Sequence, residues 1–211
     1  MKLHKSPVVL TAAAGLVALV VFLVWYRGER APLTEEEQAY YLEQMQQLTG
    51  EASGFIDPEA TRELMSSDDG KPFYVVNVFK FREQAEYGDG APNGSSGFEA
   101  FERFRTEILP IWIKNGVHPV FTTTLSGSFV NEWDMVSVVR YRSRRDYVYL
   151  QTSSDFLAIL PHRMASTEAN IRIKLPGILI PSPTFLVLFI LFFLLTTCLL
   201  VERVLAGRRS R

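Results

Sequence analysis

The residues best suited to chemistry in this sequence are polar side chains in and just after an apolar segment. Asn77, Lys80, Arg82 and Tyr87 lie within or beyond FYVVNVFKF, residues 73–81. An amide among apolar neighbours costs free energy unless it is hydrogen-bonded. Asn77 therefore indicates either a local backbone contact or the polar floor of a site. We interpret the four as ligand-binding residues with apolar walls; the alternative is that Lys80 and Arg82 are simply solvated.

Three further residues are suited to handling protons or anions. Asp134 stands beside Trp133 at the start of an apolar segment, where a desolvated carboxylate could act as a general base. His162 and Arg163 follow a proline near the end of an expected helix, and histidine titrates near neutral pH. One hypothesis makes Asp134 and His162 a catalytic pair and gives Arg163 to the ligand. The alternative is an ion pair at a strand end and a structural histidine.

Other kinds of site find little support in the sequence. The three histidines show no metal-ligand spacing, and the single cysteine, Cys198, lies in an apolar run. No phosphate-binding glycine motif and no nucleophile elbow occurs. A haem would need an axial ligand, and nothing favours His118 or His162 for that role. We therefore predict neither a cofactor nor a metal.

Charge is distributed unevenly along the chain. Residues 31–175 carry 21 acidic and 14 basic side chains, whereas the two ends carry 2 acidic and 8 basic ones. An acidic central region disfavours nucleic-acid binding. We therefore do not expect a nucleic-acid partner.

The spacing of apolar residues predicts an α+β domain over residues 73–175. Residues 73–81 alternate with the two-residue period of a strand, and residues 98–115 repeat at helical spacing. Strands are expected at 117–126, 132–141 and 170–175, with helices at 144–151 and 155–165. This order predicts a four-stranded antiparallel sheet with its helices on one face. The other face would be partly apolar, so we expect a second copy of the chain to cover it.

The two ends of the chain are apolar enough to suggest membrane helices. Residues 7–26 contain no charge and end in an aromatic pair, which favours an uncleaved anchor over a signal peptide. Residues 178–201 are apolar all round, and a basic tail follows at 202–211. A helical linker is expected at 27–72. The positive-inside bias predicts that both termini, including residues 1–6, are cytoplasmic and that the domain lies across the lipid bilayer.

Several segments together resemble uncharacterised domains of the dimeric α/β-barrel superfamily, whose fold is ferredoxin-like. These are VNVFKFREQAEYGDG, SGFEAFERF, WDMVSVVRYRSRRDY and SSDFLAILPHRMAS. The residues that match the pattern are Asn77, Lys80, Phe81, Arg82, Glu83, Tyr87, Pro110, Trp133, Asp134, Arg140, Tyr141, Pro161, His162 and Arg163. The resemblance covers about residues 73–175. It departs at Arg142, where relatives tend to have proline, and in the two apolar ends, which relatives typically lack.

The resemblance implies a ferredoxin-like βαββαβ sheet and a homodimer. It implies no particular reaction, because the superfamily holds several kinds of enzyme as well as domains with no known activity. Two hypotheses follow. In the first, a membrane-anchored domain binds a small apolar or amphipathic molecule as a sensor or accessory module. In the second, the same cleft carries out cofactor-independent acid–base chemistry like that of a monooxygenase or isomerase.

Overall fold

A computed structural model of the protein describes residues 7–28, 31–48, 51–88, 94–125, 132–177 and 183–209. Several expected segments lie wholly or partly outside these residues. They are the N-terminus at 1–6, residues 29–30 and 49–50 of the helical linker, residues 89–93 of the loop that the glycine-rich run at 88–97 indicates, the end of the strand expected at 117–126, the start of the second apolar run at 178–182, and the last two residues of the basic tail. The chain divides into two units: Arg27–Gly177, and the terminal segments Met1–Tyr26 with Ile178–Arg211.

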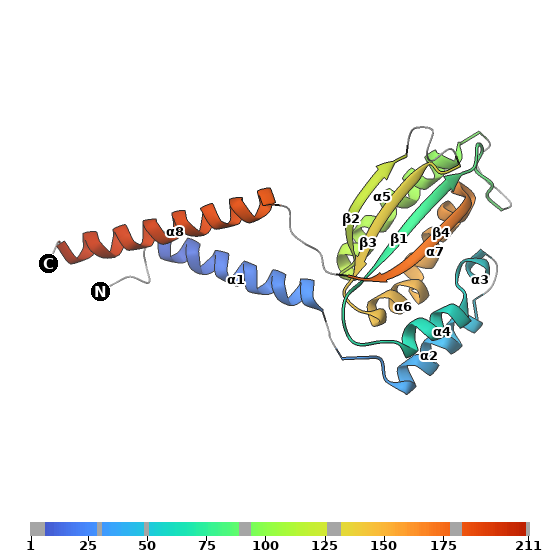
Figure 1. The fold of residues 1–211 in the computed structure, drawn as a ribbon, viewed down its shortest axis with the longest axis horizontal. Coiled ribbons are helices and arrows are strands. Elements are labelled where there is room, and N and C mark those ends of the chain that lie inside the picture. Colours follow the sequence, from blue (N-terminus) through green and yellow to red (C-terminus); the bar gives the residue numbers. More distant parts are fainter. Residues whose placement is uncertain are drawn as a thin grey trace. The chain divides into compact units, whose positions relative to one another are not determined.

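The central unit is built on a four-stranded antiparallel sheet (Figure 1). Its strands are β1 (Phe73–Phe81), β2 (His118–Thr124), β3 (Met135–Tyr141) and β4 (Thr167–Pro176). The order across the sheet is β2-β3-β1-β4. This order with its two crossover helices is the ferredoxin-like arrangement, so the predicted α+β class and topology are confirmed.

Helices cover one face of the sheet (Figure 1). They are α5 (Gly97–Lys114), α6 (Arg144–Thr152) and α7 (Ser154–Ser166). Phe79 of β1 packs on Phe101 of α5 with ring centres 4.9 Å apart. Gly97 starts α5 against the end of β1, where a Cβ would lie 2.4 Å from the carbonyl oxygen of Arg82. A glycine is therefore required at this close approach.

Residues 27–72, expected to be a helical linker, belong to the same compact unit. They form α2 (Glu35–Gln46), α3 (Glu51–Phe55) and α4 (Pro58–Ser66). Thr34 and Glu37 make the reciprocal capping box that their spacing indicates. Leu33, Met45 and Ile56 are buried in the hydrophobic core of the unit. The segment therefore adds core to the domain, because its apolar side chains are removed from water there.

The terminal segments form α1 (Pro7–Arg27) and α8 (Pro183–Arg209). Among the described residues, one helix is long and apolar enough to span a membrane, at Val187–Gly207. In α1 the corresponding apolar stretch, Ala13–Arg27, is shorter. Two spanning helices were expected, and the described residues contain one candidate, at the C-terminal end.

Candidate functional site

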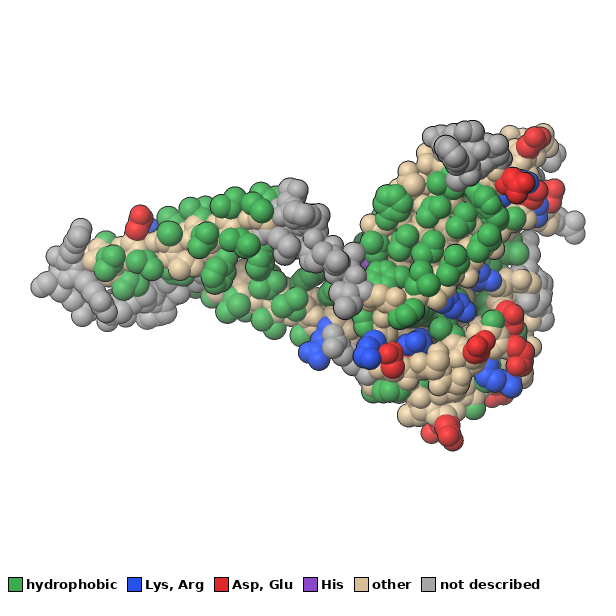
Figure 2. Space-filling view, in the orientation of Figure 1, with side chains coloured by type: hydrophobic (Ala, Val, Ile, Leu, Met, Phe, Trp, Pro, Cys, Tyr) green, Lys and Arg blue, Asp and Glu red, His purple; other side chains and the backbone are tan. Residues whose placement is uncertain are grey.

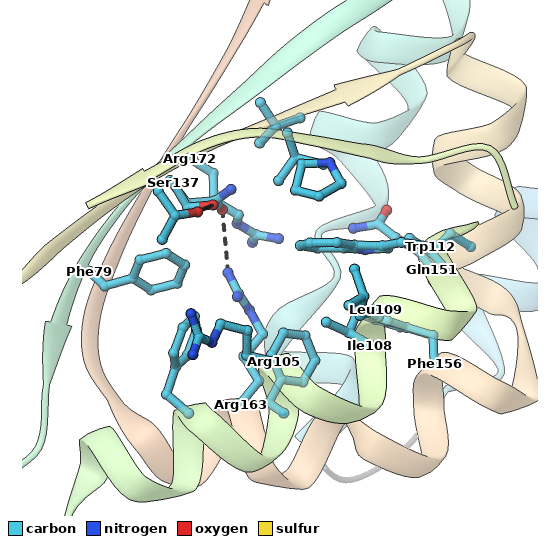
Figure 3. A pocket seen from close by; sticks show the side chains of 18 of the residues that line it. Phe79, Arg105, Ile108, Leu109, Trp112, Ser137, Gln151, Phe156, Arg163 and Arg172 are labelled. Carbon is cyan, nitrogen blue, oxygen red and sulfur yellow. Dashed lines mark hydrogen bonds between the residues drawn. The ribbon is translucent and has the colours of Figure 1, made fainter. Parts of the chain in front are cut away.

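A cavity of about 410 Å³ lies between the covered face of the sheet and the helices (Figure 3). Protein interiors contain few voids larger than a water molecule. Ligand pockets, by contrast, usually measure about 300–1,000 Å³. The volume of this cavity is therefore that of a small-molecule site.

The cavity walls are mainly apolar and aromatic. They come from every strand and from the helices, and include Phe55, Phe79, Phe101, Phe104, Ile108, Trp112, Met135, Val139, Leu150 and Phe156. Figure 3 shows Phe79 on one side and Trp112, Leu109 and Phe156 on the other. Such walls suit an apolar or aromatic molecular body, since burying it removes apolar surface from water.

Arg163 of α7 is the central polar residue of the cavity. Its side chain is buried, 8% exposed, and the guanidinium lies 4.8 Å from the centre of the Phe79 ring. The Phe55 and Phe104 rings lie 5.2 and 5.4 Å away. Burial and then the charge of Arg172 lower the pKa of Arg163 from 12.5 to about 9. The guanidinium is therefore still cationic at pH 7.

Amide oxygens hold Arg163 in place. Its Nη2 donates to Asn77 Oδ1 at 3.3 Å and to Asn170 Oδ1 at 3.0 Å. Asn170 in turn donates to the carbonyl oxygen of Val78. Asn77 is buried and lines the cavity. The amide that interrupts the apolar face of β1 therefore orients a buried arginine.

A second arginine reaches the same cavity from β4. Arg172 stands opposite Asn77 in the strand register, so both side chains share the covered face of the sheet. Its Nη2 donates to the carbonyl oxygen of Phe55 at 2.8 Å, and its guanidinium lies 4.4 Å from the Phe55 ring centre. Short helix α3 thus packs against the charged end of the cavity.

The cavity opens between β2 and α5. Its lining residues there are exposed: Pro119 and Thr122 on β2, and Arg105 and Leu109 on α5. Asn77, Phe79 and Arg163 are buried. A molecule entering between β2 and α5 therefore meets the cation deep inside.

Two further polar groups face this space. Burial raises the pKa of Tyr141, whose phenol therefore stays protonated. Gln151 donates from Nε2 to the hydroxyl of Tyr147 at 3.0 Å, while its buried Oε1 accepts no hydrogen bond from the residues described. An orphaned buried acceptor is costly unless an occupant supplies a donor.

Of the predicted site residues, Asn77 and Arg163 meet in the cavity and five others lie outside it. Asp134 Oδ2 accepts a 2.6 Å hydrogen bond from the backbone N–H of Phe81, and its own N–H donates to the carbonyl of Phe79. Pairing between β1 and β4 shifts register at Lys80/Phe81. Asp134 therefore caps the end of β1 where the ladder becomes irregular.

Tyr87 and His162 pair with each other. The Tyr87 hydroxyl lies 2.7 Å from His162 Nδ1, and His162 Nε2 lies 3.8 Å from Glu107. Neither His162 nor Asp134 lines the cavity, and each has its own partners. The geometry therefore does not favour the acid–base alternative, and the catalytic roles of these two residues stay a prediction.

Lys80 and Arg82 are engaged at the surface. Lys80 makes a 2.8 Å salt bridge with Glu168, which raises the pKa of the lysine. Arg82 lies 3.4 Å from Glu86 and borders a smaller hollow of about 280 Å³ that Arg163 and Arg172 also line. Their predicted ligand-binding roles likewise stay a prediction.

Sequence reasoning missed Arg172, Trp112, Tyr141 and Gln151 as cavity residues. A signal for Arg172 was available, because NIRIKL alternates and sets Arg172 on the face opposite Ile171 and Ile173. Nothing local marks the other three, which lie on separate elements. Among the residues described, no cluster of three or more His, Cys, Asp or Glu side chains could hold a metal.

Comparisons with known proteins support the fold. No family model matches the sequence, and no curated protein matches it. A crystal structure of a protein of unknown function from Rhodopseudomonas palustris is 22% identical with a TM-score of 0.52. It aligns over 59% of this chain and 96% of its own.

Two other solved structures were also found. The methylated form of the Rhodopseudomonas protein has a TM-score of 0.53 at 22% identity, over 60% of this chain and 96% of its own. A dimeric protein of unknown function with a ferredoxin-like fold, from Bacteroides fragilis, is 13% identical with a TM-score of 0.37. It aligns over 50% of this chain and 96% of its own. At these identities the Rhodopseudomonas structures establish the class of fold, α+β, and no activity.

Proposed function

We propose that this protein is a membrane-anchored domain that binds a small amphipathic molecule in the cavity between its sheet and helices. The observation that carries the proposal is a cavity of about 410 Å³ with aromatic walls and a few convergent polar groups. That combination is typical of small-molecule sites. A sensor or accessory role fits such a domain, since binding needs no catalytic group in the cavity.

The cavity can be tested by closing its opening. Thr122 and Thr124 are both exposed on β2, but only Thr122 lines the cavity. We expect Thr122→Trp to weaken binding of uncharged 2-naphthamide by about tenfold or more, because the indole occupies space the ligand needs. Thr124→Trp is the matched control. Calorimetric titration of the full chain in phosphatidylcholine nanodiscs measures both; equal affinity in the two variants would contradict the proposal.

The proposed anchoring is two-pass, with both termini in the cytoplasm. The apolar helix Val187–Gly207 and the shorter apolar stretch Ala13–Arg27 support it, together with the basic tail. A reporter fused at either terminus of the full chain should be protected from reagents added outside the cell. Labelling of one terminus from outside would contradict the two-pass topology, and labelling of both would reverse the orientation.

The proposed assembly is a homodimer that pairs the uncovered faces of two sheets. On that face the register aligns Val138, Val76 and Ile173 in one row. Ile171, Ile173, Leu175 and Phe121 are 44–53% exposed, and Figure 2 shows hydrophobic side chains gathered over the sheet. An extended apolar face of this kind marks an interaction surface, and a second copy offers the same flat apolar sheet.

A pair of isoleucine variants tests the dimer. Ile173 lies on the uncovered face, whereas Ile113 lies on α5, and both are exposed. We expect Ile173→Lys to convert the full chain in detergent from dimer to monomer, because it places like charges in an apolar interface. Ile113→Lys should stay dimeric. Light scattering measures the mass, and a monomeric wild-type protein would contradict the assembly.

A further inference from the structure

The geometry points to a carboxylic acid as the ligand of the cavity: an apolar or aromatic body with a carboxylate bound between Arg163 and Arg172. This inference rests on the proposed binding function and adds the chemical class of the ligand. It follows from how charge is distributed among the residues that line the cavity.

The cavity carries positive charge, and no acidic residue is among its described lining residues. Among the described lining residues are Arg105, Arg163 and Arg172, and none is Asp or Glu. Arg105 is exposed and pairs with Glu102. The two inner arginines have only neutral partners in the described part of the chain: amide oxygens and three aromatic rings for Arg163, and a carbonyl oxygen and the Phe55 ring for Arg172.

Buried charges in proteins are normally paired, because removing an ion from water costs several kcal/mol. Here the pKa of Arg163 is lowered by burial and also by the neighbouring charge of Arg172. An anion bound between the two guanidiniums would stabilise the buried charge of Arg163 and offset its repulsion with Arg172. Only the Nη2 atom of each guanidinium donates to a described protein group, so other donor nitrogens are open to a ligand.

A carboxylate fits this environment better than a phosphate. Arginine binds a planar carboxylate through two parallel hydrogen bonds. The guanidinium of Arg163 lies 4.8–5.4 Å from the centres of three aromatic rings, and these rings restrict the space for a bulky tetrahedral group. A carboxylate also carries one charge, so its desolvation costs less than that of a dianionic phosphate.

The side of the cavity opposite Phe79 suits the apolar body of the proposed ligand. Figure 3 shows Trp112, Leu109 and Phe156 away from Phe79 and Ser137. An apolar body packed there would occupy the space leading to the opening at β2 and α5. The orphaned Oε1 of Gln151 gives such a body one acceptor for a hydroxyl or amide N–H.

The test compares an isosteric acid and amide that differ in charge with a bulkier phosphate on the same ring system. 2-Naphthoic acid, 2-naphthamide and 2-naphthyl phosphate are titrated calorimetrically at pH 7 into the full chain in phosphatidylcholine nanodiscs. We expect the acid to bind about 10- to 100-fold more tightly than the amide, as hydrogen bonds to charged groups predict. The phosphate should bind more weakly than the acid.

Three arginine variants locate the effect. Arg163→Met and Arg172→Met each keep a long apolar side chain and remove the charge, and we expect each to bring the ratio of acid to amide affinity close to one. Arg103→Met, at an exposed position on α5, should keep the wild-type ratio. The amide affinity, together with the unfolding midpoint, shows that each variant is folded, and the second inner variant replaces the first if one does not fold.

Each outcome has a distinct meaning. Equal binding of acid and amide, tighter binding of the phosphate, or an unchanged ratio in both inner variants overturns the assignment of a carboxylate. In those cases the amide still binds, and the proposed function stands. If neither the acid nor the amide binds, the proposed function itself fails.

Discussion

Two regions of the central unit treat their polar residues in opposite ways. In the cavity, the cations of Arg163 and Arg172 are set among aromatic rings and amides, with no acidic residue in the described lining. At the end of β1, the polar residues Asp134, Tyr87 and Lys80 each have a protein partner. The comparison teaches that a charged residue is available to a ligand where the protein supplies no group of opposite charge to pair with it.

The first way to test this contrast is to damage the cavity wall. Phe79 is 1% exposed and packs on Phe101, so Phe79→Ala should lower the free energy of unfolding by about 3–5 kcal/mol. Phe98→Ala, 42% exposed on the same aromatic cluster, should cost far less. Urea unfolding of the full chain in nanodiscs measures both. Equal losses in the free energy of unfolding would contradict the tight packing of Phe79 in the cavity wall.

Substitution of Asp134 at the end of β1 should lower the stability of the domain and leave ligand binding unchanged. Asp134→Ala removes the acceptor for the Phe81 N–H and should lower the free energy of unfolding by about 1 kcal/mol. Asp134→Asn keeps an acceptor and should lose less. Affinity for 2-naphthoic acid should be unchanged in both. Lost binding with unchanged stability would move Asp134 into the site and revive the catalytic hypothesis.

A smaller effect is expected where Tyr87 meets His162. Tyr87→Phe removes a 2.7 Å hydrogen bond and keeps the ring, so the expected loss is about 0.5–1 kcal/mol. If the pair only fastens the segment after β1 to α7, His162→Phe should cost a similar amount and the double variant little more. Additive losses would show that the two residues act independently.

The smallest effect belongs to Lys80. Its salt bridge with Glu168 joins two exposed side chains, and such pairs contribute little because water and salt screen them. Lys80→Met should leave both the unfolding midpoint and the affinity for 2-naphthoic acid unchanged. A clear loss of affinity would restore Lys80 to the ligand site.

Much of the architecture could be predicted because it follows from local pattern. The alternation in residues 73–81, the capping box at Thr34 and the helical spacing of residues 98–115 depend on neighbours a few positions away. Asn77 was identified for the same reason, as a polar residue on an apolar face. Residues 27–72 were expected to be a linker, because propensity reveals a helix but not whether it packs on a distant core.

The chemistry of the site could be predicted only in part. Arg163 and Asn77 were named as ligand-binding residues, whereas Arg172 was not named as a site residue. Asp134 and His162 looked reactive because isolated side chains near strand and helix ends carry no visible partner in a sequence. Their partners, the Phe81 N–H and the Tyr87 hydroxyl, lie 53 and 75 residues away along the chain.

The sequence by itself determined the α+β class, the strand order along the chain, the apolar ends and the polar interruption at Asn77. Periodicity and composition are local properties, and these features require nothing else. The tertiary structure decided which charges are neutralised: register placed Arg172 opposite Asn77, and helix packing brought Arg163 to both. The groups that pair with a charge are distant from it in sequence. Only the folded chain therefore distinguishes Asp134, which accepts a backbone hydrogen bond, from Arg163 and Arg172, which have no acidic partner among the described residues.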